Sequence, residues 1–340
     1  MATIKPEHYL ALFDGKLASQ RGQTRYQPCD DGSHMFANEQ EYYEWWYLDA
    51  AFDNGYHFVL TFHFRNVFLM PMIPTIQFFI YKPDGTKQER YEMIKPQDAF
   101  AHPDYCDVKM GGNYIKDMGD YYETFIKIGS LGAHLKLTKT VPSWKPGTGL
   151  IYLDKETGHS SGWSVPVPAG NIKGRLFLKE GEIQVKGHGY HDHNWGKGAM
   201  RRFFDYWYWG RIRDEKFCIV YANVVPHQAS MPKVNPFLVM RDGQIVLSTN
   251  RLVVEPGDIQ TEPFFNQAYA NRLVLRAAVE GLEAHIVIAS KRIAEKMKLP
   301  STAERGQYYF RFIADYTMDI TIDGVKEHAK GELLHEYIIL

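Results

Sequence analysis

The chain repeats part of itself, and this repeat limits the folds open to it. Residues 43–47 (YEWWY) resemble residues 204–208 (FDYWY), 161 positions further along (205 − 44). Later segments match in the same order in both halves: 56–59 with 217–220, 78–81 with 237–240, 131–135 with 282–286, and 187–192 with 331–336. Ordered matches indicate one unit copied in tandem. We therefore expect an arm over residues 1–35 and related domains over 36–200 and 201–340.

Strand signals dominate both copies. Residues 56–65 (YHFVLTFHFR) alternate with period two, which places Tyr56, Phe58, Leu60, Phe62 and Phe64 on one face. Turn signals of the Asp-Gly and Asn-Gly type recur at residues 53–55, 83–85, 242–243 and 323–324. An all-β class follows, with each copy long enough for a barrel or curved sheet of about eight to ten strands. The charged, periodic segment from Ser290 to Lys298 predicts one helix in the second domain.

Composition excludes several classes of partner. The formal net charge is −1, from 39 Lys plus Arg and 40 Asp plus Glu, so no nucleic acid is expected. No run of 18 apolar residues occurs, which predicts no membrane span and at most a peripheral contact to collect a lipophilic substrate. The first 20 residues do not resemble a signal peptide, so a cytoplasmic location is expected. Three widely spaced cysteines predict neither a disulfide framework nor a cysteine zinc site.

A histidine-rich motif, residues 187–196 (GHGYHDHNWG), is the strongest local signal. In an extended strand His191, His193 and Trp195 share one face, and Asp192 lies on the other. His191 and His193 have the spacing of His-x-His metal sites, but the sequence nominates no third ligand. A hydrogen-bonded polar strand end and an acid–base role remain open. We expect no metal and no cofactor.

Glu44 lies within an aromatic run, and the repeat aligns it with Asp205. Burial among rings raises the pKa of a carboxyl group, which would suit a general acid. The alternative is a structural role, because Arg65, Arg211 and Arg213 are available as partners.

The two copies differ on one apolar strand face. The first copy has Leu60 and Phe62 where the second has Tyr221 and Asn223. Polar groups on an inward face are costly unless they are paired. They indicate either a buried hydrogen-bond network or a ligand site.

Residues 44–47 (EWWY) and 190–196 (YHDHNWG) resemble the hallmark motifs of the carotenoid 1,2-hydratase (hydroxyneurosporene synthase) and AttH family, and residues 162–166 (GWSVP) loosely resemble a Ser-x-Pro motif between them. The resemblance extends from residue 40 to the C-terminus. It implies two tandem lipocalin-like β-barrel domains, and relatives that include hydratases, natural-product Diels–Alderases and other cyclases. It also implies that His193 and Trp195 are functional. The hydratases carry an Asp where this chain has Asn223, and an amide cannot supply the proton that the carboxylic acid would.

The expected function is that of an enzyme on a hydrophobic isoprenoid or polyene substrate, of the lyase or isomerase type. An acid in an aromatic-lined pocket would activate an alkene for hydration or cyclisation. The alternatives are a Diels–Alderase-type pericyclase and a non-catalytic terpenoid-binding protein. The candidate catalytic residues are Asp192, His193, Tyr221, Asn223 and Glu44. The candidate substrate-binding residues are Trp46, His191, Trp195, Asp205 and Trp207.

Overall fold

The structure, a computed structural model, describes residues 14–15, 25–34, 41–65, 73–154, 157–227, 234–299 and 306–340. Antiparallel strands dominate these residues, and their helices are three short 3-10 turns: η2 (Pro28–Asp30), η3 (Pro96–Asp98) and η4 (Met200–Arg202). None of these helices is long or apolar enough to cross a membrane. The predicted all-β class is confirmed. Barrel closure and duplication of one ancestral unit stay predictions.

The chain divides into two compact units. The first unit contains residues 25–145 and 157–199, and the second contains residues 146–156 and 200–340 together with the N-terminal residues. The domain limits of 1–35, 36–200 and 201–340 stay a prediction.

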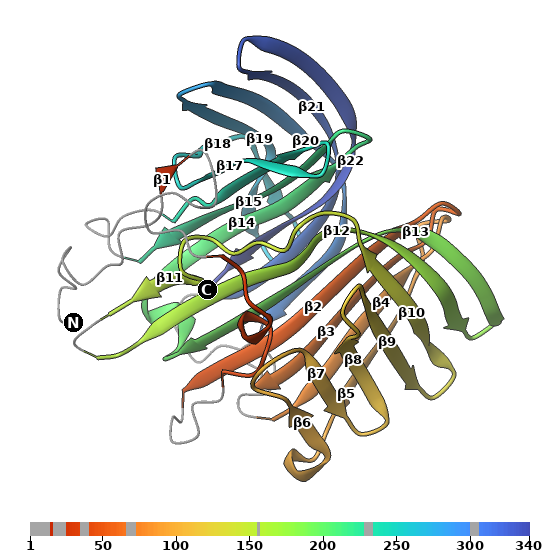
Figure 1. The fold of residues 1–340 in the computed structure, drawn as a ribbon. Helices are drawn as coiled ribbons and strands as arrows, with labels where there is room; N and C mark the ends of the chain where they lie inside the picture. Colours follow the sequence, from red (N-terminus) through yellow and green to blue (C-terminus); the bar gives the residue numbers. More distant parts are fainter. Residues whose placement is uncertain are drawn as a thin grey trace. The chain divides into compact units, whose positions relative to one another are not determined.

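The first unit is built on one antiparallel sheet in the order β5-β4-β3-β2-β13-β12-β10-β9-β8-β7-β6 (Figure 1). Its strands are β2 (Tyr42–Phe52), β3 (His57–Arg65), β4 (Thr75–Tyr81), β5 (Lys87–Met93), β6 (Ala99–Ala101), β7 (Asp107–Met110), β8 (Asn113–Asp117), β9 (Tyr121–Ile128), β10 (Leu131–Lys139), β12 (Ser160–Leu178) and β13 (Gly181–Lys197). The strand that carries the histidine-rich motif, β13, lies between β2 and β12.

The second unit has a sheet in the order β1-β17-β16-β15-β14-β22-β21-β20-β19-β18. The strands of this sheet are β1 (Asp14–Gly15), β14 (Phe204–Arg213), β15 (Phe217–Pro226), β16 (Phe237–Arg241), β17 (Gln244–Thr249), β18 (Val253–Glu262), β19 (Gln267–Val279), β20 (Leu282–Leu299), β21 (Gln307–Ile322) and β22 (Val325–Ile339). The short strand β11 (Leu150–Leu153) is not part of this sheet. The central strand of the sheet, β14, pairs with β15 on one side and β22 on the other.

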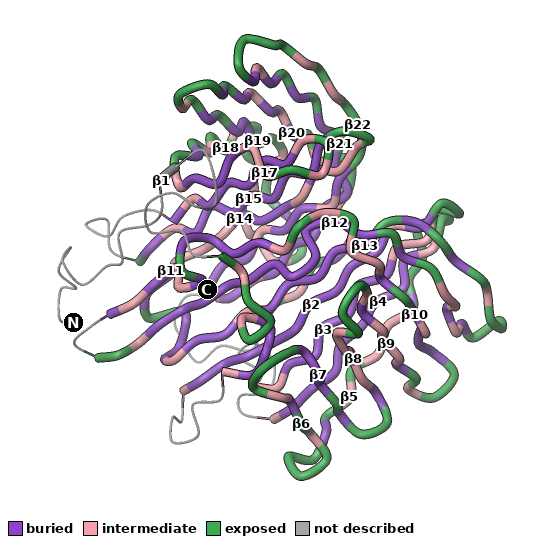
Figure 2. Tube along the Cα trace, viewed as in Figure 1, coloured by how far each residue is buried: buried purple, intermediate pink, exposed green. Residues whose placement is uncertain are grey.

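Each sheet buries one face in its own apolar core. In β3 the predicted face is confirmed, because Phe58, Leu60 and Phe62 are buried in the core of the first unit. In β15 the equivalent residues Ile219 and Tyr221 are buried in the core of the second. Buried segments accordingly run along the middle of both sheets, whereas the hairpin tips are exposed (Figure 2).

The predicted helix over Ser290–Lys298 is wrong, because this segment belongs to strand β20. β20 pairs with β21 along its whole length, but the register shifts between Ser290 and Arg292 and again between Ile293 and Glu295. Each bulge inserts an extra residue and breaks the alternation of a strand. The resulting spacing of apolar and charged residues imitated a helical period.

The sequence repeat relates β3 to β15 without an offset, but the neighbouring strands β2 and β14 are offset by one residue. Leu60 pairs with Leu48 in the first unit, and Tyr221, 161 positions later, pairs with Gly210 in the second. Leu48 and Gly210 are 162 positions apart, so β2 and β14 are offset by one further residue. A shift of one residue reverses the face of every side chain. Trp46 therefore contributes to the first core. Trp207, which the repeat aligns with Trp46, lies on the face of β14 opposite to that of the core residue Tyr208.

Candidate functional site

The inner face of the first sheet carries a cluster of buried histidines on β13. His191, His193 and Trp195 pair across the strand boundary with Leu48, Trp46 and Glu44 of β2. The side chains of His191, His193 and Glu44 are all fully buried. The predicted shared face thus becomes a polar patch within an apolar core.

Glu44 accepts hydrogen bonds at both carboxylate oxygens. Oε2 accepts from the hydroxyls of Ser33, at 3.0 Å, and Tyr42, at 2.7 Å. Oε1 accepts from the His34 backbone N–H, at 2.6 Å, and lies 3.1 Å from His193 Nε2. Burial alone would raise the pKa of Glu44, but the hydrogen bond to His193 and its positive charge, together with the other donors, outweigh burial and lower it. The partner is a histidine rather than the arginines considered from the sequence, and Glu44 is held as a carboxylate.

His191 and His193 each have an oxygen acceptor at both ring nitrogens. His193 Nδ1 lies 3.2 Å from the Asp30 carbonyl oxygen, opposite its contact with Glu44. His191 Nδ1 lies 2.8 Å from the Tyr47 carbonyl oxygen, and its Nε2 lies 3.1 Å from Asp31 Oδ2. Burial opposes protonation of His191, but the charge of Asp31 and the hydrogen bonds outweigh it and raise its pKa. Each of the two rings therefore lies between a carboxylate oxygen and a backbone carbonyl oxygen.

Residues 25–34 supply half of this cluster, and the sequence analysis missed them. Asp31, Ser33 and the His34 backbone contact β2 and β13, and the Trp46 indole N–H donates to the Asp31 carbonyl at 3.0 Å. The available signal was the polar run 30–34 (DDGSH), which stands in a segment with no apolar periodicity.

Aromatic rings enclose the cluster. The Trp46 ring stacks on His193 with centroids 4.2 Å apart, and the His34 ring stacks on Trp195 at 3.8 Å. Burial, followed by the neighbouring charge of His193, lowers the pKa of His34 to about 4, so its ring is neutral near pH 7. The His193 ring therefore lies among aromatic rings, stacked on Trp46 and tilted to Trp195 at 5.0 Å.

Asp192 lies on the opposite face of β13 from His191 and His193. Its oxygens accept from the Trp163 indole at 3.1 Å, the Tyr190 hydroxyl at 2.8 Å and the Asn194 amide at 2.9 Å. The three donors occupy both carboxylate oxygens, so Asp192 belongs to a separate network.

The second unit places Tyr221 and Asn223 on β15 with different surroundings. Asn223 Nδ2 donates to Asn235 Oδ1 at 2.7 Å, and Asn235 Nδ2 donates onward to the Leu252 carbonyl at 2.8 Å. The Tyr221 hydroxyl is fully buried and has no hydrogen-bond partner among the described residues. Asn223 thus belongs to a network, whereas Tyr221 presents an unpaired hydroxyl.

His335 lies on the opposite side of Gly210 from Tyr221, and it could not be singled out from its own local sequence. Gly210 pairs with Tyr221 in β15 and with His335 in β22. His335 Nε2 lies 3.2 Å from Ser290 Oγ, but its buried Nδ1 has no partner among the described residues. Burial lowers the pKa of His335 to about 3, so the ring is neutral. The signal was present in the repeat, which aligns residues 331–336 with 187–192 and therefore His335 with His191.

A chain of rings continues from this pair across the inner face of the second sheet. Tyr208 stacks on Tyr337 at 4.5 Å, and Phe312 stacks on His335 at 4.7 Å. Phe310 lies between them, with its centroid 6.3 Å from Tyr337 and 6.2 Å from Phe312. We call these five residues the aromatic wall.

The two remaining predicted substrate-binding residues lie apart from this wall. Asp205 Oδ1 lies 2.9 Å from His227 Nδ1, and Asp205 sits at the bulge between Phe204 and Tyr206. Trp207 points to the face opposite Tyr208. The structure therefore brings together Glu44, Trp46, His191, His193 and Trp195 in the first unit, and Tyr221 with Asn223 in the second.

Gly210 has a packing role that can be tested. A Cβ at this position would lie 2.6 Å from the Tyr221 hydroxyl and 2.8 Å from two ring atoms. We expect Gly210→Ala to displace the Tyr221 ring and lower the free energy of unfolding by about 1–3 kcal/mol, measured by urea denaturation. Gly257→Ala is the control, because a Cβ there meets nothing within 4 Å. Equal stability of the two variants would contradict this packing.

Two antiparallel sheets with buried polar groups on apolar inner faces define the class of protein. Comparison with known proteins shows which families and structures it resembles. Residues 142–251 match the family described as carotenoid hydratase CrtC. A stretch of 65 residues is 35% identical to the hydroxyneurosporene dehydrogenase of Chlorobaculum tepidum, and covers 17% of this chain and 17% of that protein. The chain thus matches about a sixth of this curated relative's length.

Solved structures extend the likeness over the whole chain. A protein described as AttH from Nitrosomonas europaea superimposes with a TM-score of 0.65 at 16% identity, covering 92% of this chain and 96% of that one. CghA, crystallised with Sch210972, gives 0.64 at 15% identity, with 97% and 98% covered. Kievitone hydratase from Nectria haematococca gives 0.60 at 13% identity, with 99% and 98% covered. The structures share the fold, and the matches together confirm the resemblance to the carotenoid hydratase CrtC family.

Proposed function

We propose that the chain is an enzyme that binds a hydrophobic isoprenoid or polyene molecule against the aromatic wall and activates it for hydration or cyclisation. The observation that carries this proposal is the pair formed by Tyr221 and His335. Both residues are fully buried, both flank Gly210, and each has a polar atom without a partner among the described residues. Buried polar atoms are almost always paired, so this pair is suited to a polar group of a ligand. The match to a hydratase family supports the reaction class.

The two groups have complementary chemistry. Burial raises the pKa of Tyr221, so its hydroxyl is a neutral hydrogen-bond donor at pH 7. The neutral His335 ring can accept a proton at Nδ1 while Ser290 holds its other nitrogen. In hydration, Tyr221 would donate a proton to one alkene carbon, water would bond to the other carbon, and His335 would take one proton from that water and return it to the Tyr221 phenolate. A phenol is a weak acid, so the alkene must be conjugated to a polarising group such as a carbonyl.

A Diels–Alderase-type cyclisation is the second candidate. It transfers no proton and needs only shape and hydrogen bonds to a substrate carbonyl, which two neutral polar groups on an apolar wall can supply. The carboxylates of Glu44 and Asp192 are already occupied by several donors, and this favours a reaction without a strong acid. A rate independent of pH would support cyclisation, and an acidic limb would support hydration. The predicted catalytic roles of His193, Asp192 and Glu44 stay predictions, as does non-catalytic binding.

Tyr221→Phe is the test of this site. It removes the unpaired hydroxyl and keeps the ring, so we expect unchanged or slightly higher stability but a loss of activity of about 10- to 100-fold. The assay is incubation with retinal and related conjugated polyenes, followed by mass spectrometry for addition of water or for a cyclised isomer. Retinal supplies both the polyene and a carbonyl that reports hydrogen bonding through its absorption.

Tyr43→Phe is the matched control, because the Tyr43 hydroxyl donates to Ser161 Oγ at 2.7 Å in the first unit. This variant should lose about 1 kcal/mol of stability and keep its activity. Full activity in both Tyr221→Phe and His335→Phe would rule out the proposed site.

A further inference from the structure

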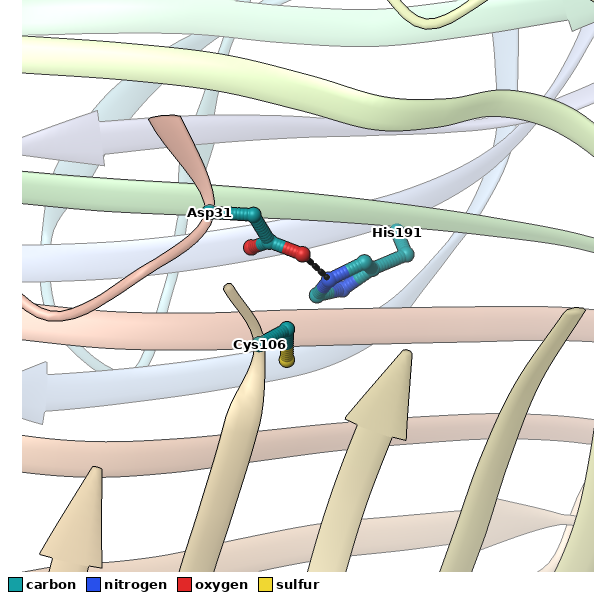
Figure 3. Close-up of side chains that lie close together, drawn as sticks. All are labelled: Asp31, Cys106 and His191. Atoms are coloured by element: carbon teal, nitrogen blue, oxygen red, sulfur yellow. Dashed lines mark hydrogen bonds and ion pairs between the residues drawn. The ribbon is translucent and has the colours of Figure 1, made fainter. Parts of the chain in front are cut away.

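The first unit contains a second group of reactive side chains, separate from the aromatic wall. Asp31, Cys106 and His191 come from the segment 25–34, from the loop before β7 and from β13 (Figure 3). Their ligand atoms all lie within 4.8 Å of one another, and the three side chains are essentially fully buried. We propose that these residues bind a divalent transition-metal ion of the zinc type.

The orientation of His191 suits a ligand. Its Nδ1 lies 2.8 Å from the Tyr47 carbonyl oxygen and must donate its proton there. In the neutral ring, Nε2 then directs a lone pair at Asp31 Oδ2, 3.1 Å away. Two electron pairs that face each other at this distance require a cation, either a proton or a metal ion. A backbone carbonyl that fixes the distal ring nitrogen is also the usual surrounding of a metal-ligating histidine.

Asp31 supplies an independent observation. Its Oδ2 accepts from the Tyr122 hydroxyl at 2.6 Å, but its Oδ1 has no hydrogen-bond partner among the described residues. His193 Nδ1 lies 3.9 Å from Oδ1, which is too long for a hydrogen bond. A carboxylate oxygen that is 1% exposed and unpaired is costly, and a metal ion would satisfy it.

The donor set selects the kind of ion. Thiolate, imidazole and carboxylate are the ligands of zinc, whereas calcium and magnesium prefer oxygen ligands alone. Tetrahedral coordination at 2.0–2.3 Å places donor atoms about 3.5 Å apart, a separation between the 3.1 Å from His191 Nε2 to Asp31 Oδ2 and the 4.8 Å that bounds the group. Binding must displace the proton of the Cys106 thiol. Three protein ligands are the number found where a fourth position remains open.

Cobalt(II) titration of the full chain tests this site, because cobalt replaces zinc and reports a thiolate ligand through a charge-transfer absorption. The double variant Cys29→Ser/Cys218→Ser leaves Cys106 as the only thiol, since the chain has three cysteines. We expect the thiolate band to saturate at about one equivalent in wild type and in this double variant. Zinc should displace the cobalt and raise Tm.

Cys106→Ser should abolish the band, and Asp31→Asn should abolish the zinc-dependent rise in Tm. If Cys106→Ser does not fold, the double variant decides, because only Cys106 can produce its band. Absence of the band in the double variant would overturn the proposal. A band that persists in folded Cys106→Ser would do the same.

Discussion

Glu44→Gln is expected to lower the free energy of unfolding by about 3–5 kcal/mol, because it breaks a buried ion pair and leaves one charge uncompensated. Glutamine cannot accept from Ser33, Tyr42 and the His34 backbone with both of its terminal atoms, and its amide would face at least one donor. His193 Nε2 would lose its carboxylate partner at the same time. Urea denaturation at pH 7 measures the change.

A histidine–glutamate pair on the surface, with almost the same distance between nitrogen and oxygen, provides the control. His134 Nε2 lies 3.0 Å from Glu123 Oε1, and both side chains are about one-third exposed. Because solvent screens such pairs, Glu123→Gln should change stability by less than about 1 kcal/mol. A similarly small effect in Glu44→Gln would mean that the buried pair carries no charge.

Stability is expected to fall steeply between about pH 6.5 and pH 4, before ordinary carboxylates titrate. Burial, with help from the charge of His193, lowers the pKa of His34 to about 4. Burial lowers the pKa of His63 to about 4 against the opposing hydrogen bond with Gln77, and that of His335 to about 3. Each folded pKa lies below the unfolded value of about 6.5. The stability contribution is therefore complete above pH 6.5 and is lost as the pH falls toward the folded values.

Each of these histidines contributes up to about 1.4 kcal/mol per pH unit, so the three together reach about 4 kcal/mol per unit near pH 5. The free energy of unfolding measured in urea at a series of pH values tests the slope. His335→Phe should flatten it, because a phenylalanine keeps the stacking on Phe312 and does not titrate. His328→Gln, at an exposed position, should leave it unchanged. A constant stability from pH 6.5 to pH 5 would contradict the expectation.

The strands and their faces could be predicted because alternation is a local property. Residues 56–65 show it without interruption, and the structure places Phe58, Leu60 and Phe62 in the core as expected. The segment 290–298 could not be assigned in this way, since its two bulges depend on the register with β21. The repeat likewise gave the correct face for Tyr221 but not for Trp207, because one extra position between the strands reverses the face.

Only those features of the site that depend on a single strand could be predicted from the sequence. The histidine-rich motif placed His191 and His193 on one face, but not their partners. Asp31 lies 160 residues from His191 in the chain, and no periodicity relates them. The pKa direction of Glu44 was unpredictable for the same reason, because burial is visible in a local aromatic run and the distant His193 is not. His335 was within reach, since the repeat already aligned it with His191.

The distance along the chain between residues 25–34 and β13 has a consequence for how the protein is made. Asp31 and Glu44 emerge early from the ribosome, but their histidine partners follow 160 and 149 residues later. Until then both carboxylates must remain hydrated, and their final partners cannot help to align the early strands. Contacts of such long sequence separation slow folding. The buried charges should therefore lock the first unit only at the end of its folding, when β13 inserts between β2 and β12.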